Sequence, residues 1–176
     1  MDRRSAVKSF LIAGSALAFF PSCLQDKKIT SVKLKNLSID QDQEKLLGEI
    51  TETLIPKTDT PGAKDLSLHL FVLKMMDDLF EKEQQEKFVK GLDQIDEIAE
   101  KNYNNRFVKL TAPQREELLN RVEKKEFSGD VQSFYPLMKQ LTITGYLNSK
   151  YVMTKLRVYE LVPARFHGCV PVKKVS

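Results

Sequence analysis

The residues best placed for nucleophilic chemistry are His167 and Cys169, two positions apart near the C-terminus. On an extended segment this spacing puts both side chains on the same side, and a nearby imidazolium favours the reactive thiolate. No third group in the sequence completes a triad with them, and local cysteine motifs transfer poorly between protein families. We therefore expect no catalytic residue in this chain.

Metal, nucleotide and serine-hydrolase chemistry is not indicated either. The other histidine, His69, lies in an apolar stretch far from His167 and is interpreted as a core or boundary residue, so converging metal ligands are missing. The seven glycines form no phosphate-binding loop, and no serine lies in a G-x-S-x-G turn. The acidic pairs Asp77-Asp78 and Glu116-Glu117 are expected on solvated faces. We expect neither a metal nor a cofactor in this chain.

The N-terminal 23 residues have the pattern of an export signal. Arg3 and Arg4 precede an uncharged run from residue 10 to residue 20, which is too short to span a membrane and is typical of a signal peptide. Adjacent arginines followed by Lys8 resemble the twin-arginine signal, which addresses a transporter of folded proteins. A general secretory signal that begins with two arginines is the alternative.

Cys23 occupies the position at which a bacterial lipobox places its lipidated cysteine. Several acyl chains on Cys23, each contributing about 0.8 kcal/mol per buried methylene, would give a stable membrane anchor. Residues 24–39 would then form a tether and residues 40–176 the folded domain. The alternative is a soluble exported protein in which Cys23 is removed or left free.

The cysteine count links Cys23 to Cys169, because the chain has only these two. If Cys23 is lipidated, Cys169 is the odd cysteine in an oxidising compartment, which favours an intermolecular disulfide or a free thiol. If Cys23 is retained without lipid, a bridge between the two is the competing account.

Length and composition indicate one globular domain after the leader. The chain has 176 residues, of which 41% are hydrophobic and 30% charged. Arg3, Arg4 and Lys8 against Asp2 account for two of its four net positive charges, so the rest of the chain is close to neutral. This balance does not favour a nucleic-acid partner. No second apolar run is long enough to cross a bilayer.

Helical periodicity with clear start and stop signals predicts an all-α domain of about five helices, arranged like a bundle. Asp40 with Gln43 and Thr111 with Gln114 have the spacing of capping boxes, and Pro56 ends the first helix. Apolar residues recur at helical spacing in five stretches, which run over residues 40–55, 66–80, 83–103, 111–127 and 131–147.

The C-terminal segment is irregular and rich in aromatic residues, and a segment of this kind must lie against something. Aromatic side chains and arginine commonly anchor interfaces, so a partner is one candidate, and the chain's own helical domain is the other. The residues that we predict for a partner interface or an interchain disulfide are Tyr146, Tyr151, Tyr159, Pro163, Arg165, Phe166, His167, Gly168 and Cys169.

Several blocks of the chain, in order and spacing, resemble subunit 3 of gluconate 2-dehydrogenase and of related membrane-bound flavoprotein sugar dehydrogenases. The resemblance covers roughly residues 46–171 and does not specify a substrate. The matching blocks are 54–63 (LIPKTDTPGA), 83–88 (EQQEKF), 110–114 (LTAPQ), 141–146 (LTITGY), 159–163 (YELVP) and 168–171 (GCVP).

The resemblance implies a small subunit without a cofactor. In that family the catalytic subunit is a flavoprotein of the glucose–methanol–choline type, which carries FAD, and a cytochrome c subunit takes the electrons. A twin-arginine signal on the small subunit would export the folded, flavin-loaded partner as a pre-formed complex. We thus expect a non-catalytic accessory subunit and export partner, in the periplasm and lipid-anchored to a membrane. The alternative is a stand-alone helical envelope lipoprotein with a binding or scaffold role.

Overall fold

A computed structural model describes residues 30–157 and residue 169. In these residues all regular structure is helical, and no strand is present. The elements, in chain order, are α2 (Gln41–Leu54), α3 (Leu68–Leu79), α4 (Lys82–Tyr103), the 3-10 turn η1 (Phe107–Lys109), α5 (Ala112–Glu123), α6 (Val131–Leu147) and the π-helical turn η2 (Val152–Leu156). The prediction of an all-α domain of about five helices is confirmed.

Capping boxes start three of the helices. At α2 the backbone N–H of Gln43 donates to Oδ1 of Asp40 at 2.8 Å, and the backbone N–H of Asp40 donates to Oε1 of Gln43 at 3.0 Å. The same reciprocal arrangement opens α5 and, from Glu81, α4. Two of the three follow from the sequence, because they lie directly before apolar periodic runs.

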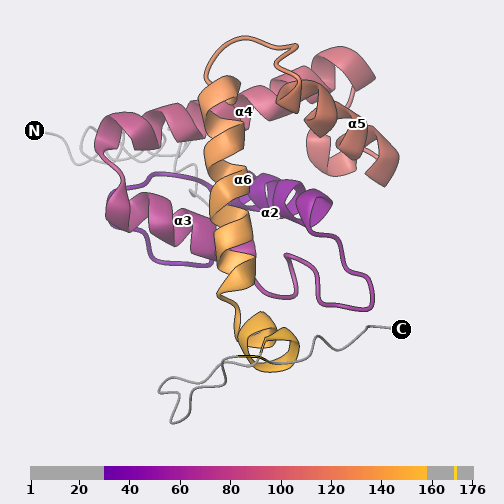
Figure 1. The fold of residues 1–176 in the computed structure, drawn as a ribbon. Coiled ribbons are helices and arrows are strands. Elements are labelled where there is room, and N and C mark those ends of the chain that lie inside the picture. Colours follow the sequence, from indigo (N-terminus) through magenta and orange to yellow (C-terminus); the bar gives the residue numbers. More distant parts are fainter. Residues whose placement is uncertain (1–29, 158–168, 170–176) are drawn as a thin grey trace, which may run out of the picture.

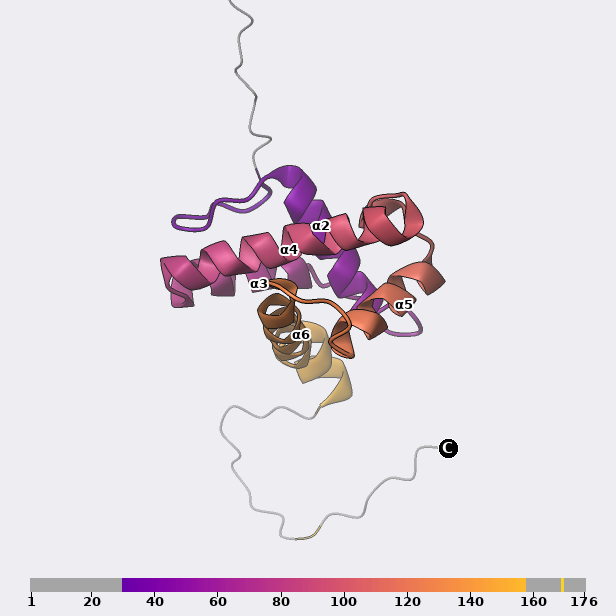
Figure 2. The ribbon, with the colours of Figure 1, turned by 90° about the horizontal axis from the view of Figure 1, so that it is seen from above.

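Helix α6 is the centre of the arrangement. It crosses in front of α3 and α4, while α2 lies behind it and α5 lies beside its N-terminal half (Figures 1 and 2). Glycines make two of these crossings close, because Gly91 of α4 lies against Phe134 of α6, and Gly145 of α6 lies against the ring of Phe71 of α3. A helix with neighbours on several sides needs apolar residues around much of its circumference, which α6 has.

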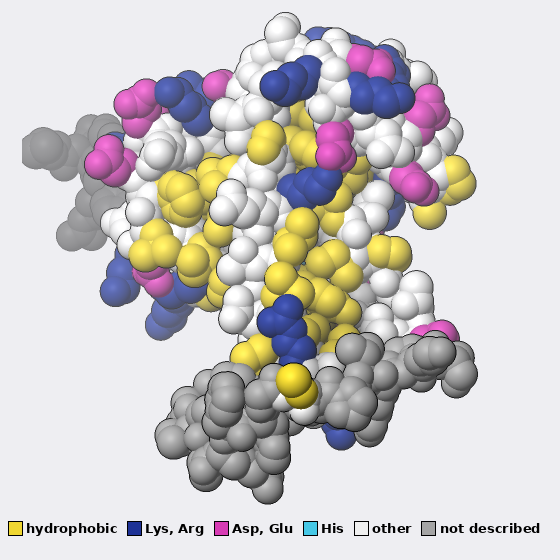
Figure 3. Space-filling view, viewed as in Figure 1, with side chains coloured by type: hydrophobic (Ala, Val, Ile, Leu, Met, Phe, Trp, Pro, Cys, Tyr) yellow, Lys and Arg dark blue, Asp and Glu magenta, His cyan; other side chains and the backbone are white. Residues whose placement is uncertain are grey.

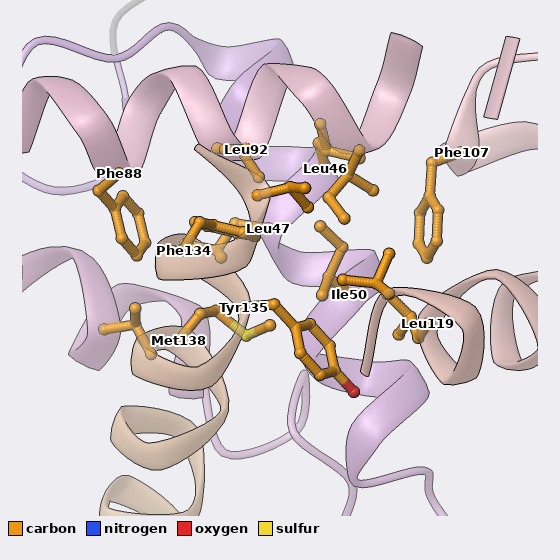
Figure 4. Packing of buried hydrophobic residues seen from close by; sticks show 14 of the residues in the cluster. Leu46, Leu47, Ile50, Phe88, Leu92, Phe107, Leu119, Phe134, Tyr135 and Met138 are labelled. Atoms are coloured by element: carbon orange, nitrogen blue, oxygen red, sulfur yellow. The ribbon is translucent and has the colours of Figure 1, made fainter. Parts of the chain in front are cut away.

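The core lies where α2, α4 and α6 meet. Phe88 and Phe134 pack edge to face with their ring centroids 4.8 Å apart, a geometry that aromatic quadrupoles favour. Figure 4 shows that Leu46, Leu47 and Ile50 of α2 fill the middle of the same core, and that Phe107 and Leu119 close it on the side of α5. Burial of this set supplies the main stabilisation of the domain.

Residues 24–39 were expected to form a tether. The structure describes this segment from residue 30, and residues 30–39 pack against the helical domain. Leu37 is buried in the core, and Val32, Leu34 and Ile39 are partly buried against it. Asp77 of α3, only 1% exposed, accepts hydrogen bonds from the backbone of this segment. The expectation that Asp77 lies on a solvated face is therefore wrong. Its neighbour Asp78 and the pair Glu116-Glu117 are exposed.

Within residues 30–157, no helix combines the length and the apolar character that crossing a bilayer requires.

Candidate partner-binding surface

The outward face of α6 carries a single charged residue. Between Val131 and Ser149 the only ionisable side chains are those of Lys139 and two tyrosines, and the lysine is half-buried. The exposed positions of the helix are Ser133, Pro136, Gln140, Ile143, Thr144 and Leu147. Ile143 is 43% exposed and Leu147 is 38% exposed, although the same helix already buries its other side in the core.

Helix α4 provides the contrast, because its outward face is almost entirely charged. Its exposed positions are Lys82, Glu83, Gln84, Glu86, Lys87, Lys90, Glu97, Glu100, Lys101 and Asn102. A charged outer face is what solvent exposure alone selects. Depletion of charge, by contrast, distinguishes the centre of protein–protein interfaces from the rest of a protein surface. Helix α4 thus has the charged outer face of a solvent-exposed helix, whereas the outer face of α6 is poor in charge.

A groove of about 390 Å³ lies between α5 and α6 and adjoins this face. Five of its eleven lining residues are apolar. Figure 3 shows hydrophobic side chains along the α6 side of the molecule, interrupted by Lys or Arg and by Asp or Glu side chains. The groove is lined by Val122, Val131, Tyr135, Pro136, Ile143 and Thr144, with Glu123, Lys125, Gln132, Lys139 and Gln140 also contributing. Its size suits one or two bulky side chains from a partner.

Two of the three charged residues that line the groove, Glu123 and Lys139, neutralise one another. Nζ of Lys139 lies 2.6 Å from Oε1 of Glu123, and this hydrogen bond lowers the pKa of Glu123. The hydroxyl of Tyr135 lies 3.4 Å from Oε2 of the same carboxylate and can donate a hydrogen bond to it. Burial, followed by the negative charge of Glu123, raises the pKa of Tyr135 to about 12, so its phenol stays neutral. The groove therefore presents Tyr135, apolar side chains and the charge of Lys125.

Apolar side chains are exposed past the end of α6 as well, in η2, where they lie among the exposed basic residues Lys150, Lys155 and Arg157. The N–H of Arg157 donates to the carbonyl of Val152 at 2.8 Å, which closes a wide π-type turn with Val152 buried beneath it. Such turns are rare and occur often at functional sites. Leu156 is 55% exposed, and Tyr151 is half-buried. Tyr151 and Leu156 therefore add apolar surface beyond Leu147, the last residue of α6.

The predicted interface residues fall into two groups. Tyr146 and Tyr151 lie at the C-terminal end of this surface, each half-buried, and Cys169 is exposed. The remaining interface candidates lie outside the described residues, and these are Tyr159, Pro163, Arg165, Phe166, His167 and Gly168. The export residues Arg3 and Arg4 and the lipidation candidate Cys23 also lie outside them. The sequence interpretation placed the interface in the aromatic tail and did not include the α6 face. The sequence did contain a signal for that face, because Lys139 is the one charged residue in the long predicted helix over residues 131–147.

Of the two histidines, His69 lies in the described part of the chain, where it is half-buried at the start of α3. Its ring lies 3.8 Å from where a Cβ on Gly48 would be, and its Nδ1 is buried without a hydrogen-bond partner. Burial lowers the pKa of His69, which keeps it neutral. In the described ranges 30–157 and 169, no cluster of three or more His, Cys, Asp or Glu residues is arranged to hold a metal.

Comparison with known proteins gives one positive result. The family model described as "Gluconate 2-dehydrogenase subunit 3" matches residues 41–164, which includes every helix described here. The searches of curated proteins and of solved structures gave no match. Because the family model covers well over half of the sequence and agrees with the blocks that resemble this subunit, the chain belongs to the gluconate 2-dehydrogenase subunit 3 family.

Proposed function

We propose that this chain is the non-catalytic small subunit of a flavin-dependent dehydrogenase that oxidises a sugar or polyol, and that it binds the flavoprotein subunit through the outward face of α6. Its role is to hold and accompany the catalytic subunit. The catalytic partner is of the glucose–methanol–choline type and carries the FAD. A cytochrome c subunit is a further candidate member of the complex.

The charge-poor outer face of α6 is the observation that carries this proposal. In a family defined by a subunit of a dehydrogenase, a surface that is poor in charge and exposes Ile143 and Leu147 beside a partly apolar groove fits a permanent interface better than a free surface. Burial of large apolar side chains in such a groove is the usual source of binding energy at interface centres.

Export of a folded complex is the second part of the proposal. A flavin is inserted before export, so its protein must cross the membrane folded, and the arginine pair of the small subunit would serve both chains. Lipidation of Cys23 would then hold the complex at the envelope membrane. Replacing Arg3 and Arg4 by lysines should retain both chains in the cytoplasm; export of the doubly substituted chain would contradict the twin-arginine route.

Purification of the tagged chain from its native cells tests the proposed partner. The envelope fraction should yield a second, larger chain in near-equal amount, with flavin absorption near 450 nm. A monomer without flavin would contradict the proposal and favour the stand-alone envelope lipoprotein.

A further inference from the structure

A buried carboxylate fastens the start of the described chain to the helical domain. The residues 30–39, named here the strap, have no regular secondary structure, so their backbone N–H groups need acceptors from elsewhere. Asp77 of α3 supplies them. Its Oδ1 accepts from the N–H groups of Asn36 at 2.6 Å and Leu37 at 2.8 Å, and its Oδ2 accepts from the N–H of Lys35 at 2.9 Å.

Further contacts make this attachment specific. The side-chain amide of Asn36 donates to the carbonyl of Asp77 at 3.0 Å, so the strap also satisfies the α3 backbone. The side chain of Leu37 is 6% exposed and belongs to the core. At the other end of the strap, the N–H of Ser31 donates to Oε2 of Glu44 at 2.7 Å, and Glu44 is also buried. Two buried carboxylates from α3 and α2 therefore hold the strap at both ends.

The strap lies on the side of the domain that faces away from α6. In Figure 1 the strap, in indigo, passes behind α3 and α4 while α6 is in front. Figure 2, turned by 90°, places the strap along one edge and α6 along the opposite edge, with α3 and α4 between them. The contacts agree, because the strap is bonded to α2 and α3, which lie behind α6.

We propose that Asp77 is a latch that fixes the strap to α3, so that whatever precedes residue 30 is attached to the domain on the side opposite the α6 binding surface. This inference rests on the proposed function, because the side of attachment matters only if a partner binds the α6 surface. A signal or lipid anchor held on the far side leaves the α6 surface free, and a folded partner on α6 leaves the N-terminal attachment accessible. A free tether of the same length would allow both to compete for the same space.

Amide hydrogen exchange on the full-length chain tests the latch without any partner. In the native chain the N–H groups of Lys35, Asn36 and Leu37 should exchange at least ten-fold more slowly than an unstructured chain would. Asp77→Asn should remove most of this protection while leaving that of α4 intact. Asp78→Asn, at the exposed neighbouring carboxylate, is the matched control and should leave the strap protected. Unprotected strap amides in the native chain would overturn the latch, whatever the variants do.

A bulky label tests the side of attachment. In a background with Cys23→Ser and Cys169→Ser, the exposed residues Ser31 and Gln140 are replaced singly by cysteine and coupled to a 5-kDa polyethylene glycol maleimide. The label on the Ser31→Cys variant should leave capture of the flavoprotein subunit within two-fold of the unlabelled chain, and the label on the Gln140→Cys variant should reduce it at least ten-fold.

The outcomes separate the two proposals. Loss of capture with the label on the Ser31→Cys variant would overturn the opposite-side arrangement. Failure of the unlabelled chain to capture any flavoprotein would instead contradict the proposed function, and hydrogen exchange would still decide the latch.

Discussion

Gly91 of α4 and Phe134 of α6 lie closer than any side chain at position 91 would allow. A Cβ at position 91 would overlap the Cβ of Phe134 and lie 2.9 Å from the carbonyl oxygen of Asp130, which is backbone and cannot rotate away. Gly91→Ala should therefore push α6 from α4 and lower the free energy of unfolding by about 1–3 kcal/mol. Urea denaturation followed by circular dichroism measures this.

Gly48→Ala is the matched control, because Gly48 is also a buried glycine inside a helix. A Cβ there would meet the ring of His69 at 3.8 Å, which is ordinary contact. Removing the conformational freedom of glycine should raise the free energy of unfolding by about 0.5–1 kcal/mol. Equal effects of the two substitutions would contradict the assignment of Gly91 as the point of closest approach.

The Asp77 latch predicts a pH dependence of stability with a defined sign. Burial raises the pKa of Asp77, but the three backbone N–H donors from Leu37, Lys35 and Asn36 outweigh it and lower the pKa from 3.8 to about 2. A lowered pKa in the folded state stabilises the protein above the unfolded value, and this stabilisation is lost as the pH falls towards 2. The shift corresponds to roughly 2 kcal/mol at neutral pH.

Unfolding measurements on native chain and Asp77→Asn check this between pH 6 and pH 2. The difference in unfolding free energy should be constant above about pH 5 and should shrink as the pH falls through the range from 3.8 to about 2. A difference that stays constant down to pH 2 would show that the carboxylate charge is not what holds the strap.

Arg115 should be irreplaceable by lysine, because its guanidinium joins three elements. Nη1 lies 2.5 Å from Oε2 of Glu49 on α2, Nη2 donates to the carbonyl of Val108 at 2.6 Å, and Nε donates to the carbonyl of Phe107 at 3.2 Å. Lysine lacks the planar fork and would leave a carbonyl without its donor, so Arg115→Lys should cost about 1–3 kcal/mol. Thermal unfolding provides the measurement.

The control for Arg115 is Arg121→Lys on the same helix. Arg121 bonds Glu126 and Asn102 at the surface, where such pairs contribute little. It should change stability by less than about 1 kcal/mol. A larger loss at Arg121 than at Arg115 would refute the special position of Arg115.

We predict a disulfide between Cys169 and another chain, which electrophoresis can detect. Its side chain is exposed, and an exposed single thiol in an oxidising compartment tends to pair with another chain. Without reductant, the envelope complex should show a band of higher mass that disappears with dithiothreitol and with Cys169→Ser. An identical pattern for native chain and variant would exclude the interchain bridge.

Local signals predicted the helices well and the long-range contacts poorly. The boxes of Asp40 with Gln43 and Thr111 with Gln114 were predictable because both partners lie three residues apart. Asp77 was misinterpreted because its partners in the strap lie about 40 residues earlier. One signal was present even so, since Asp77 follows Leu73 by four residues and Met76 by one, which places it on the buried side of α3.

The interface residues predicted from the sequence overlap the proposed α6 surface only at its C-terminal end. Aromatic composition drew attention to Tyr146, Tyr151 and the residues after them, whereas the centre of the proposed surface is on α6 itself. Ile143 and Leu147 continue the apolar pattern of that helix, so their sequence positions resemble core positions. The packing of α3, α4 and α5 decides which apolar residues of α6 remain exposed. That packing cannot be predicted from the periodicity of α6 alone.

The most direct test of the central claim places a charge at the centre of the α6 surface. Ile143→Glu should weaken capture of the flavoprotein subunit at least 30-fold, because it buries an unpaired carboxylate at an interface. Leu79→Glu is the matched control, since Leu79 is an apolar side chain on α3 that is 67% exposed. It should bind like the native chain. Equal binding by both variants, with both folded, would contradict the assignment of the α6 face as the partner surface.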